Sequence, residues 1–159
     1  MTAPTTAVAP GRTPPAVPRA TPLAGSVTVT ARPDAADGTG LTAATAFTVA
    51  ADEPVLPGHY PGFPIFPGIC LVEYVHTSAL ATVPGGPGTG PQLAAIESTR
   101  FTGAVYPGDE LTAELAWKQQ PDGWQCKAVV RSPRGDAARV RLRYRTTTAP
   151  AAGAEGTTP

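Results

Sequence analysis

Residues 52–79 read DEPVLPGHYPGFPIFPGICLVEYVHTSA, a stretch that joins a proline-rich loop to a helix. Seven prolines and glycines stand from Pro54 to Pro67, and their backbone preferences exclude a regular element over residues 50–67. Residues 68–82 contain no helix breaker, and a start directly after proline is typical of a helix N-terminus. This stretch therefore predicts a loop that leads into one helix.

The predicted helix is apolar around most of its circumference. At helical spacing one face holds Ile69, Val72, Val75, Ala79 and Leu80, and Leu71 widens it. We therefore expect the helix to be largely buried.

Extended runs surround this helix. Residues 26–32 and 41–49 alternate and are rich in β-branched side chains, which predicts two strands before the loop. Four more extended runs follow at residues 92–100, 111–118, 124–131 and 138–146, separated by turn sequences such as YPGD, QPDG and PRGD. The order strand, strand, helix and four strands predicts an α+β fold in which one buried helix packs on a mostly antiparallel sheet.

The chain of 159 residues has room for one domain. Residues 1–25 and 146–159 lack periodicity and cannot bury enough apolar surface to offset their ordering entropy, so we expect two disordered tails. Residues 26–145 then form the folded domain, which contains every Trp, Tyr and Phe of the chain.

Composition excludes several classes of protein. Twelve basic residues balance twelve acidic ones, so the whole chain lacks the charge of a nucleic-acid binder. No apolar run is long enough to span a bilayer or resembles a signal peptide, which predicts a soluble, cytoplasmic protein. The two cysteines, Cys70 and Cys126, show no metal-ligand spacing with the two histidines and are expected to be buried small hydrophobes.

Two acid/base groups stand in the loop and the helix. His59 carries an imidazole that can accept a proton near neutral pH. Glu73 lies in the apolar helix, where an ionised carboxylate is costly, so it is either paired or its pKa is raised. A structural histidine and a paired glutamate remain the ordinary alternatives for these two residues.

Gly68 adds a third element at the expected start of the helix. Its N–H is one of the unsatisfied donors of a first helical turn, which favour partial negative charge, and a glycine there lets a carbonyl approach closely. A base, an acid and such an N–H are the parts needed to remove a proton next to a thioester carbonyl and to expel a β-hydroxyl. The reaction class predicted from these parts is a reversible dehydration.

The same stretch resembles a known family. HYPGFPIFPG followed by ICLVEYV is similar to the signature of the 3-hydroxyacyl-[acyl carrier protein] dehydratases of the hotdog-fold superfamily. DEPVLPG before it, and IESTRFTGAVYPGDELTAEL after it, also resemble this family. The resemblance implies a hotdog fold, in which an antiparallel sheet wraps a long helix.

The resemblance also implies roles for residues. His59 would take the α-proton, Glu73 would protonate the departing hydroxyl and the Gly68 N–H would polarise the thioester carbonyl, without any metal or organic cofactor. The expected product is a trans-2-enoyl thioester in fatty-acid-like, polyketide or polyene biosynthesis. The predicted substrate-binding residues are Tyr60, Phe63, Ile65, Phe66 and Pro67.

An acyl carrier protein is the partner that this family implies, and such carriers are strongly acidic. Residues 127–145 hold seven Lys or Arg against the single acid Asp136. We expect part of this stretch, Arg141 and Arg143, or else Arg100, to dock the carrier or its phosphopantetheine. The alternative is an ordinary solvated sheet face.

Two other functions remain open. Family members place the histidine and the acid of one site on different subunits, which implies a dimer. His76 and Thr77 replace the Ala and Gln that usually follow the family's acid, so the chain is alternatively one subunit of a heterodimeric dehydratase with a partly or wholly non-catalytic role. A hotdog acyl thioesterase is the other alternative.

Overall fold

The computed structural model describes residues 23–33, 41–59 and 62–146. One α-helix, α1 (Gly68–Thr82), is accompanied by β1 (Thr28–Ala31), β2 (Leu41–Thr48), β3 (Pro91–Phe101), β4 (Glu110–Gln120), β5 (Gly123–Ser132) and β6 (Gly135–Thr146). Two 3₁₀ turns, η2 (Leu56–Gly58) and η3 (Pro87–Thr89), lie in the connections. The predicted helix and all six predicted strands are confirmed, while most of the expected tails, residues 1–22 and 147–159, lies outside the described residues.

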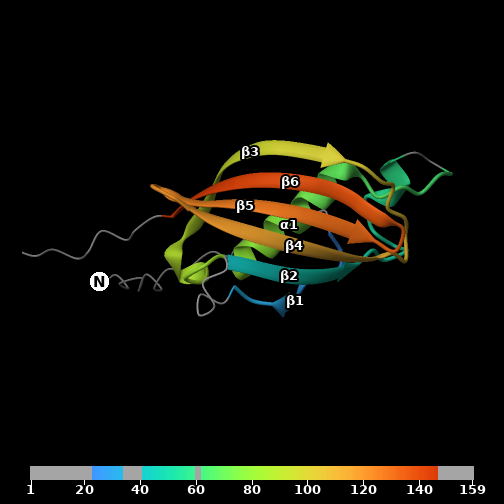
Figure 1. Cartoon of the computed structure of the whole chain (residues 1–159). Helices are drawn as coiled ribbons and strands as arrows, with labels where there is room; N and C mark the ends of the chain where they lie inside the picture. Colours follow the sequence, from blue (N-terminus) through green and yellow to red (C-terminus); the bar gives the residue numbers. More distant parts are fainter. Residues whose placement is uncertain (1–22, 34–40, 60–61, 147–159) are drawn as a thin grey trace, which may run out of the picture.

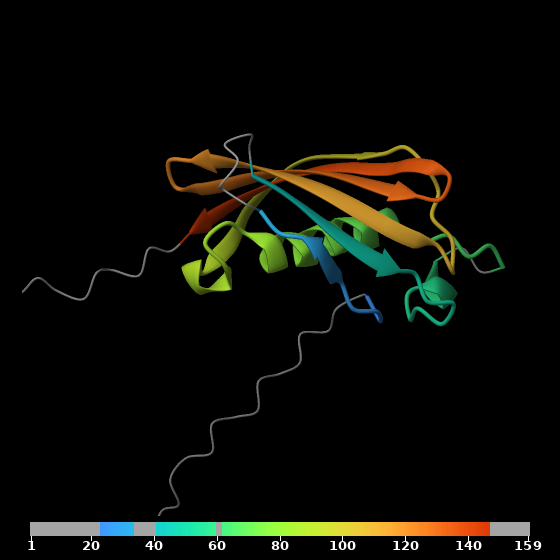
Figure 2. The same ribbon diagram turned by 60° about the horizontal axis from the view of Figure 1, so that its bottom comes forward.

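The six strands form one antiparallel sheet in the order β1-β2-β4-β5-β6-β3. Figure 1 shows α1 running behind this sheet, and Figure 2 shows the sheet curving over the helix. β3 follows the helix in sequence but pairs with β6, so it ends the sheet and leaves one side of an 11-residue strand unpaired. This is the one-helix α+β arrangement that the sequence predicts.

The core lies between α1 and the inner face of the sheet. Alternation on β4 buries Leu111, Ala113, Leu115 and Trp117, and β6 buries Val140, Leu142 and Tyr144 in the same way. Cys70 and Cys126 are buried free cysteines, as predicted, and burial raises the pKa of these thiols to about 11 and about 12. Both thiols therefore remain protonated at neutral pH.

The helix is buried as expected except at its first turn. Val72, Val75 and Ala79 are buried, but Ile69 is 66% exposed and Leu80 is only partly covered. The prediction of a buried Ile69 is wrong, because that side of α1 faces the open edge of the sheet near β3.

The folded part begins before the predicted boundary at residue 26. Leu23 is buried in the core, and the next backbone N–H, that of Ala24, donates to Glu53 Oε2 at 2.9 Å. Glu53 is itself only 1% exposed, so the hydrogen bond holds this segment against the core. None of the described helices is long and apolar enough to cross a bilayer.

Candidate active site

His59 ends the η2 turn, where its backbone N–H donates to the Leu56 carbonyl at 3.2 Å. The imidazole is half-buried, and its Nδ1 lies 3.0 Å from the carbonyl oxygen of Ile65. A carbonyl can only accept a hydrogen bond, so Nδ1 carries the proton of this contact. In the neutral ring Nε2 is then the basic nitrogen, which is the tautomer that a general base needs.

Gly68 begins α1 after Pro67, which provides no side-chain cap. Its N–H donates to no acceptor in the described part of the chain and remains available at the positive end of the helix dipole. A Cβ built on Gly68 would lie only 2.8 Å from Cζ of Phe101. The lack of a side chain at Gly68 is therefore what lets the Phe101 ring pack against the start of α1.

Glu73 lies on α1 about 7.5 Å along the helix axis from Gly68, given a rise of roughly 1.5 Å per residue. Its side chain is half-exposed, and no hydrogen bond or ion pair joins it to another residue in the described ranges. Of the alternatives that the sequence leaves for Glu73, a paired carboxylate is not found among the described residues of one chain, and its role as the acid stays a prediction. Burial raises the pKa of Cys70 and of Tyr144, and the negative charge of Glu73 is a smaller cause that acts in the same direction.

His76 lies one turn after Glu73 and contacts β6. Its Nδ1 is 2.8 Å from the hydroxyl of Tyr144, and the two rings stack at 5.8 Å with an interplanar angle of 4°. Tyr144 is fully buried, and desolvation raises the pKa of its phenol far above the ordinary value, so it keeps its proton. The sequence left the role of His76 open, and in the structure its imidazole is hydrogen-bonded to the buried Tyr144 hydroxyl.

Replacing His76 is expected to destabilise the protein through Tyr144. His76→Ala removes the hydrogen-bond partner of a buried phenol and costs about 1–3 kcal/mol of unfolding free energy. Tyr144→Phe in the same background restores part of that loss, because no hydroxyl is then left buried without a partner. Urea denaturation of the two single variants and the double variant measures this, and strictly additive losses would contradict the contact.

The predicted substrate-binding residues fall into different environments. Phe63 is 58% exposed, and its ring meets Tyr106 edge-on at 6.4 Å. Ile65 is half-buried, Phe66 packs in the core against Phe47, and Pro67 is buried. Tyr60 lies outside the described residues. Phe63 is therefore the most exposed of the members that the structure describes.

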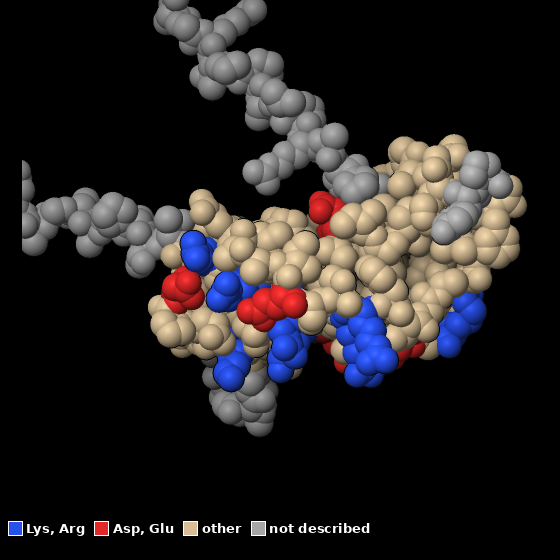
Figure 3. All heavy atoms as spheres, turned by 90° about the horizontal axis from the view of Figure 1, so that it is seen from above, with Lys and Arg blue, Asp and Glu red and all other residues tan. Residues whose placement is uncertain are grey.

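An apolar surface that the sequence did not predict extends from the start of α1 to β3. Its exposed members are Ile69, Leu93, Ile96 and Phe101. Figure 3, seen from the side on which Figure 1 places β3, shows a broad area largely without charge, bordered by Lys and Arg. The sequence contained the Arg100-Phe101 pair but no local signal that this ring would cover Gly68.

The predicted docking arginines lie on the sheet face opposite α1. They alternate along β6 with buried residues, and Arg100 on β3 stands opposite Arg139 in the strand register. Arg143 is 3.8 Å from Glu97, whereas Arg100 and Arg141 have no ion pair with any described residue. Thr102, Asp136 and Arg139 join Arg100 around a pocket of about 320 Å³.

Comparison with known proteins supplies the family context. Residues 35–135 match the family model described as ApeI dehydratase. A 3-hydroxyacyl-[acyl-carrier-protein] dehydratase FabZ from Symbiobacterium thermophilum is 41% identical over 70 residues, which cover 42% of this chain and 49% of that protein. The chain thus spans about half the length of the curated relatives it matches.

Two solved structures show the same hotdog fold. The dehydratase heterocomplex ApeI:P from Xenorhabdus doucetiae aligns with a TM-score of 0.51 at 17% identity, covering 65% of this chain and 87% of that one. A hypothetical thioesterase with coenzyme A from Streptococcus pneumoniae aligns with a TM-score of 0.61 at 13% identity, covering 77% and 86%. The fold is therefore shared by proteins of both names and does not distinguish the two chemistries.

Proposed function

The chain belongs to the ApeI-like dehydratase family, and on that premise we propose that it dehydrates a 3-hydroxyacyl thioester carried on an acyl carrier protein. The observation that carries this proposal is the contact between His59 Nδ1 and the Ile65 carbonyl, which leaves Nε2 as the basic nitrogen. The loop that holds His59 ends at Gly68, so one chain supplies both a base and an N–H donor at a helix start.

The proposed reaction balances with these groups alone. Nε2 of His59 removes the proton next to the thioester carbonyl, and the negative charge that moves onto the carbonyl oxygen is stabilised by the Gly68 N–H. Protonated Glu73 gives its proton to the β-hydroxyl, the C–O bond breaks, and water and the trans-2-enoyl thioester leave. His59 then returns its proton to solvent, and Glu73 takes one up.

Glu73 lies where a partner chain could cover it. In the single chain its side chain is only half-buried. Glu73 stands one turn after the exposed Ile69 on α1, so the two share a face of the helix, and the start of that helix meets Phe101 at the end of the edge strand β3. We infer that a second hotdog chain covers this side and completes each site with its own histidine.

Mixing two inactive variants tests this shared site. If two copies of the chain form the dimer, one site of a His59→Ala/Glu73→Gln hybrid keeps both groups and the other loses both. Random exchange makes about half of the dimers hybrid, so about a quarter of wild-type activity returns. Each variant mixed with wild-type chain is the control. A mixture that exchanges subunits, as shown by mass, yet stays inactive would contradict a site shared between two copies.

The carrier is proposed to dock on the arginines of the outer sheet face. Arg100 and Arg141 form no ion pair with a described residue. An acidic partner would therefore be attracted most strongly by these two guanidinium groups. Arg143 is already engaged by Glu97 and stands beside them. The phosphate of the carrier's prosthetic group is a second anion that the pocket beside Arg100 and Thr102 suits.

Charge reversal separates docking from chemistry. Arg100→Glu and Arg141→Glu together are expected to raise KM for carrier-bound substrate at least about tenfold at low salt, since steering by surface charge is strong there. Turnover of the same acyl group on neutral N-acetylcysteamine should not change. Arg32→Glu, beyond the opposite edge of the sheet, is the matched control. An unchanged KM for the carrier substrate would contradict the docking site.

Approach to equilibrium from both directions tests the reaction itself. The enzyme is expected to bring carrier-bound 3-hydroxyacyl and trans-2-enoyl thioesters to one common ratio, whichever of the two is supplied. A thioesterase would instead release the free thiol of the carrier from either substrate. Detection of that thiol with no interconversion would replace the dehydratase by the thioesterase.

A further inference from the structure

The turn between β3 and β4 is fastened by a buried carboxylate. Asp109 is mostly buried, and its Oδ2 accepts a hydrogen bond from the Tyr106 N–H at 2.8 Å and an ion pair from Arg134 in the β5–β6 turn. The backbone of the turn is also tied to the end of β2, since Val49 N–H donates to the Asp109 carbonyl and Gly108 N–H donates to the Val49 carbonyl. The backbone on which Tyr106 stands is therefore fixed.

Arg134 also fixes the side chain of Tyr106. Its guanidinium carbon lies 4.7 Å from the centre of the Tyr106 ring, which is the geometry of a cation–π contact. Tyr106 in turn meets the ring of Phe63 edge-on, at 6.4 Å and 87°. A chain of contacts thus runs from Arg134 through Tyr106 to Phe63.

This chain of contacts ends in the loop that carries His59. Phe66 N–H donates to the Val105 carbonyl at 2.8 Å, so the loop and the β3–β4 connection just before Tyr106 are joined a second time. Between these two attachments lies Ile65, whose carbonyl holds His59 Nδ1. The backbone that orients the base and the ring of Phe63 therefore belong to one braced segment.

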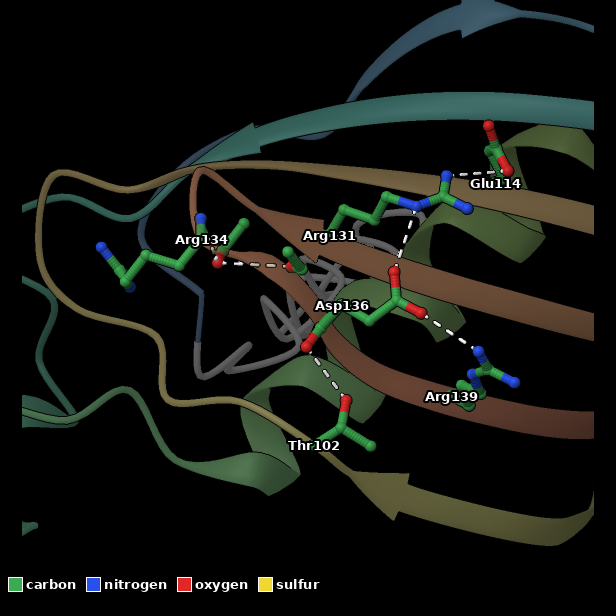
Figure 4. A network of polar contacts seen from close by, with 8 residues as sticks. Thr102, Glu114, Arg131, Arg134, Asp136 and Arg139 are labelled. Atoms are coloured by element: carbon green, nitrogen blue, oxygen red, sulfur yellow. Dashed lines mark hydrogen bonds and ion pairs between the residues drawn. The ribbon is translucent and has the colours of Figure 1, made fainter.

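The neighbouring arginines of this hairpin make no such contact with Tyr106. Figure 4 shows Arg131 and Arg139 converging on Asp136, while the side chain of Arg134 points away from that cluster. Arg131 has the same charge, lies in the same hairpin and contacts Glu114 at 2.9 Å, but it makes no contact with Tyr106 and does not line the pocket beside Arg100. It is therefore a matched control for the loss of one paired arginine.

We propose that Arg134 is a positioning residue for the acyl-binding side of the site: it holds Tyr106, and Tyr106 holds the exposed Phe63 ring against which the acyl chain lies. This inference rests on the proposed dehydratase function and adds a residue outside the acid/base machinery. Its effect falls on substrate binding and grows with the length of the acyl chain, because a short acyl group does not reach Phe63.

Steady-state kinetics with a short and a long 3-hydroxyacyl carrier substrate test the proposal. Arg134→Gln is expected to raise KM for the long substrate roughly fivefold, as expected for loss of a cation–π contact and a weakened aromatic pair. The short substrate and kcat should be unchanged. Arg131→Gln should behave as wild type, and Tyr106→Leu, which keeps the Arg134–Asp109 pair, should behave as Arg134→Gln.

A double variant decides whether Arg134 acts through Phe63. If it does, Arg134→Gln adds nothing to KM once Phe63→Leu is present. Additive increases, or an equal rise for both chain lengths, would mean that Arg134 contacts the carrier itself and would overturn the proposal.

An NMR measurement keeps this inference separate from the proposed activity. The chain has only four phenylalanines, so ring signals of ¹³C-labelled Phe are readily assigned with Phe63→Leu. Arg134→Gln is expected to shift the Phe63 ring signals, and Arg131→Gln is expected to leave them in place. An inactive wild type with shifted signals would refute the dehydratase function alone, whereas unshifted signals would refute the positioning role whatever the activity.

Discussion

His59→Ala is expected to lower kcat for carrier-bound substrate by about 10²–10⁴-fold, the usual contribution of a positioned general base. KM should change little, because the imidazole acts on the reacting carbon and does not anchor the carrier. The purified variant and wild type, compared at saturating substrate, measure this loss.

The fold should survive this substitution. His59 is half-buried at the end of a 3₁₀ turn, and the loop keeps its own backbone hydrogen bond between Phe66 and Val105. An unchanged melting temperature would assign the lost activity to chemistry. A variant that keeps more than about a tenth of wild-type kcat would contradict the role of His59 as the base, since general bases contribute far more.

Glu73→Gln is expected to lower kcat by a similar factor, about 10²–10⁴-fold, because the amide keeps the size of the side chain and has no proton to give. The substitution also removes a half-buried charge that has no ion pair with any described residue, and keeping such a charge away from water is costly. Stability should therefore stay level or rise while activity falls.

Loss of activity without loss of stability is the result expected for a catalytic acid, whereas replacing a structural carboxylate would lower the stability as well. Glu110→Gln, at an exposed position of β4, is the control and should leave both quantities unchanged. A Glu73→Gln variant with nearly wild-type kcat would show that another group protonates the leaving hydroxyl.

The helix and the loop before it could be predicted from sequence because their signals are local. Pro67 sets the start of α1 and the prolines from Pro54 onward exclude other elements, so the predicted and observed bounds of the helix agree at Gly68 and Thr82. The strands were predictable for the same reason, since alternation needs no knowledge of the pairing partner.

Features that depend on distant contacts could not be predicted. β3 pairs with β6 at the end of the sheet, which exposes Ile69 although its spacing matches the buried face of the helix. The Phe101 ring over Gly68 joins two segments more than thirty residues apart in the printed sequence. Leu23 belongs to the core because Glu53, in a later loop, binds the neighbouring backbone.

Glu73 is the functional candidate whose single-chain environment differs from the one that the sequence predicts. The apolar helix predicts a desolvated carboxyl group, and the chain by itself leaves that group half-exposed. A partner over β3 and the first turn of α1 would reconcile the two, because the same apolar side chains that are exposed here would then be covered.

The decisive measurement is the intact mass of a carrier-bound 3-hydroxyacyl group after incubation with the purified protein. Wild type is expected to remove the mass of one water, and His59→Ala and Glu73→Gln, with unchanged melting temperatures, are expected to remove none. A well-folded wild type that leaves the mass unchanged, or a variant that still removes water at the wild-type rate, would contradict dehydration by His59 and Glu73.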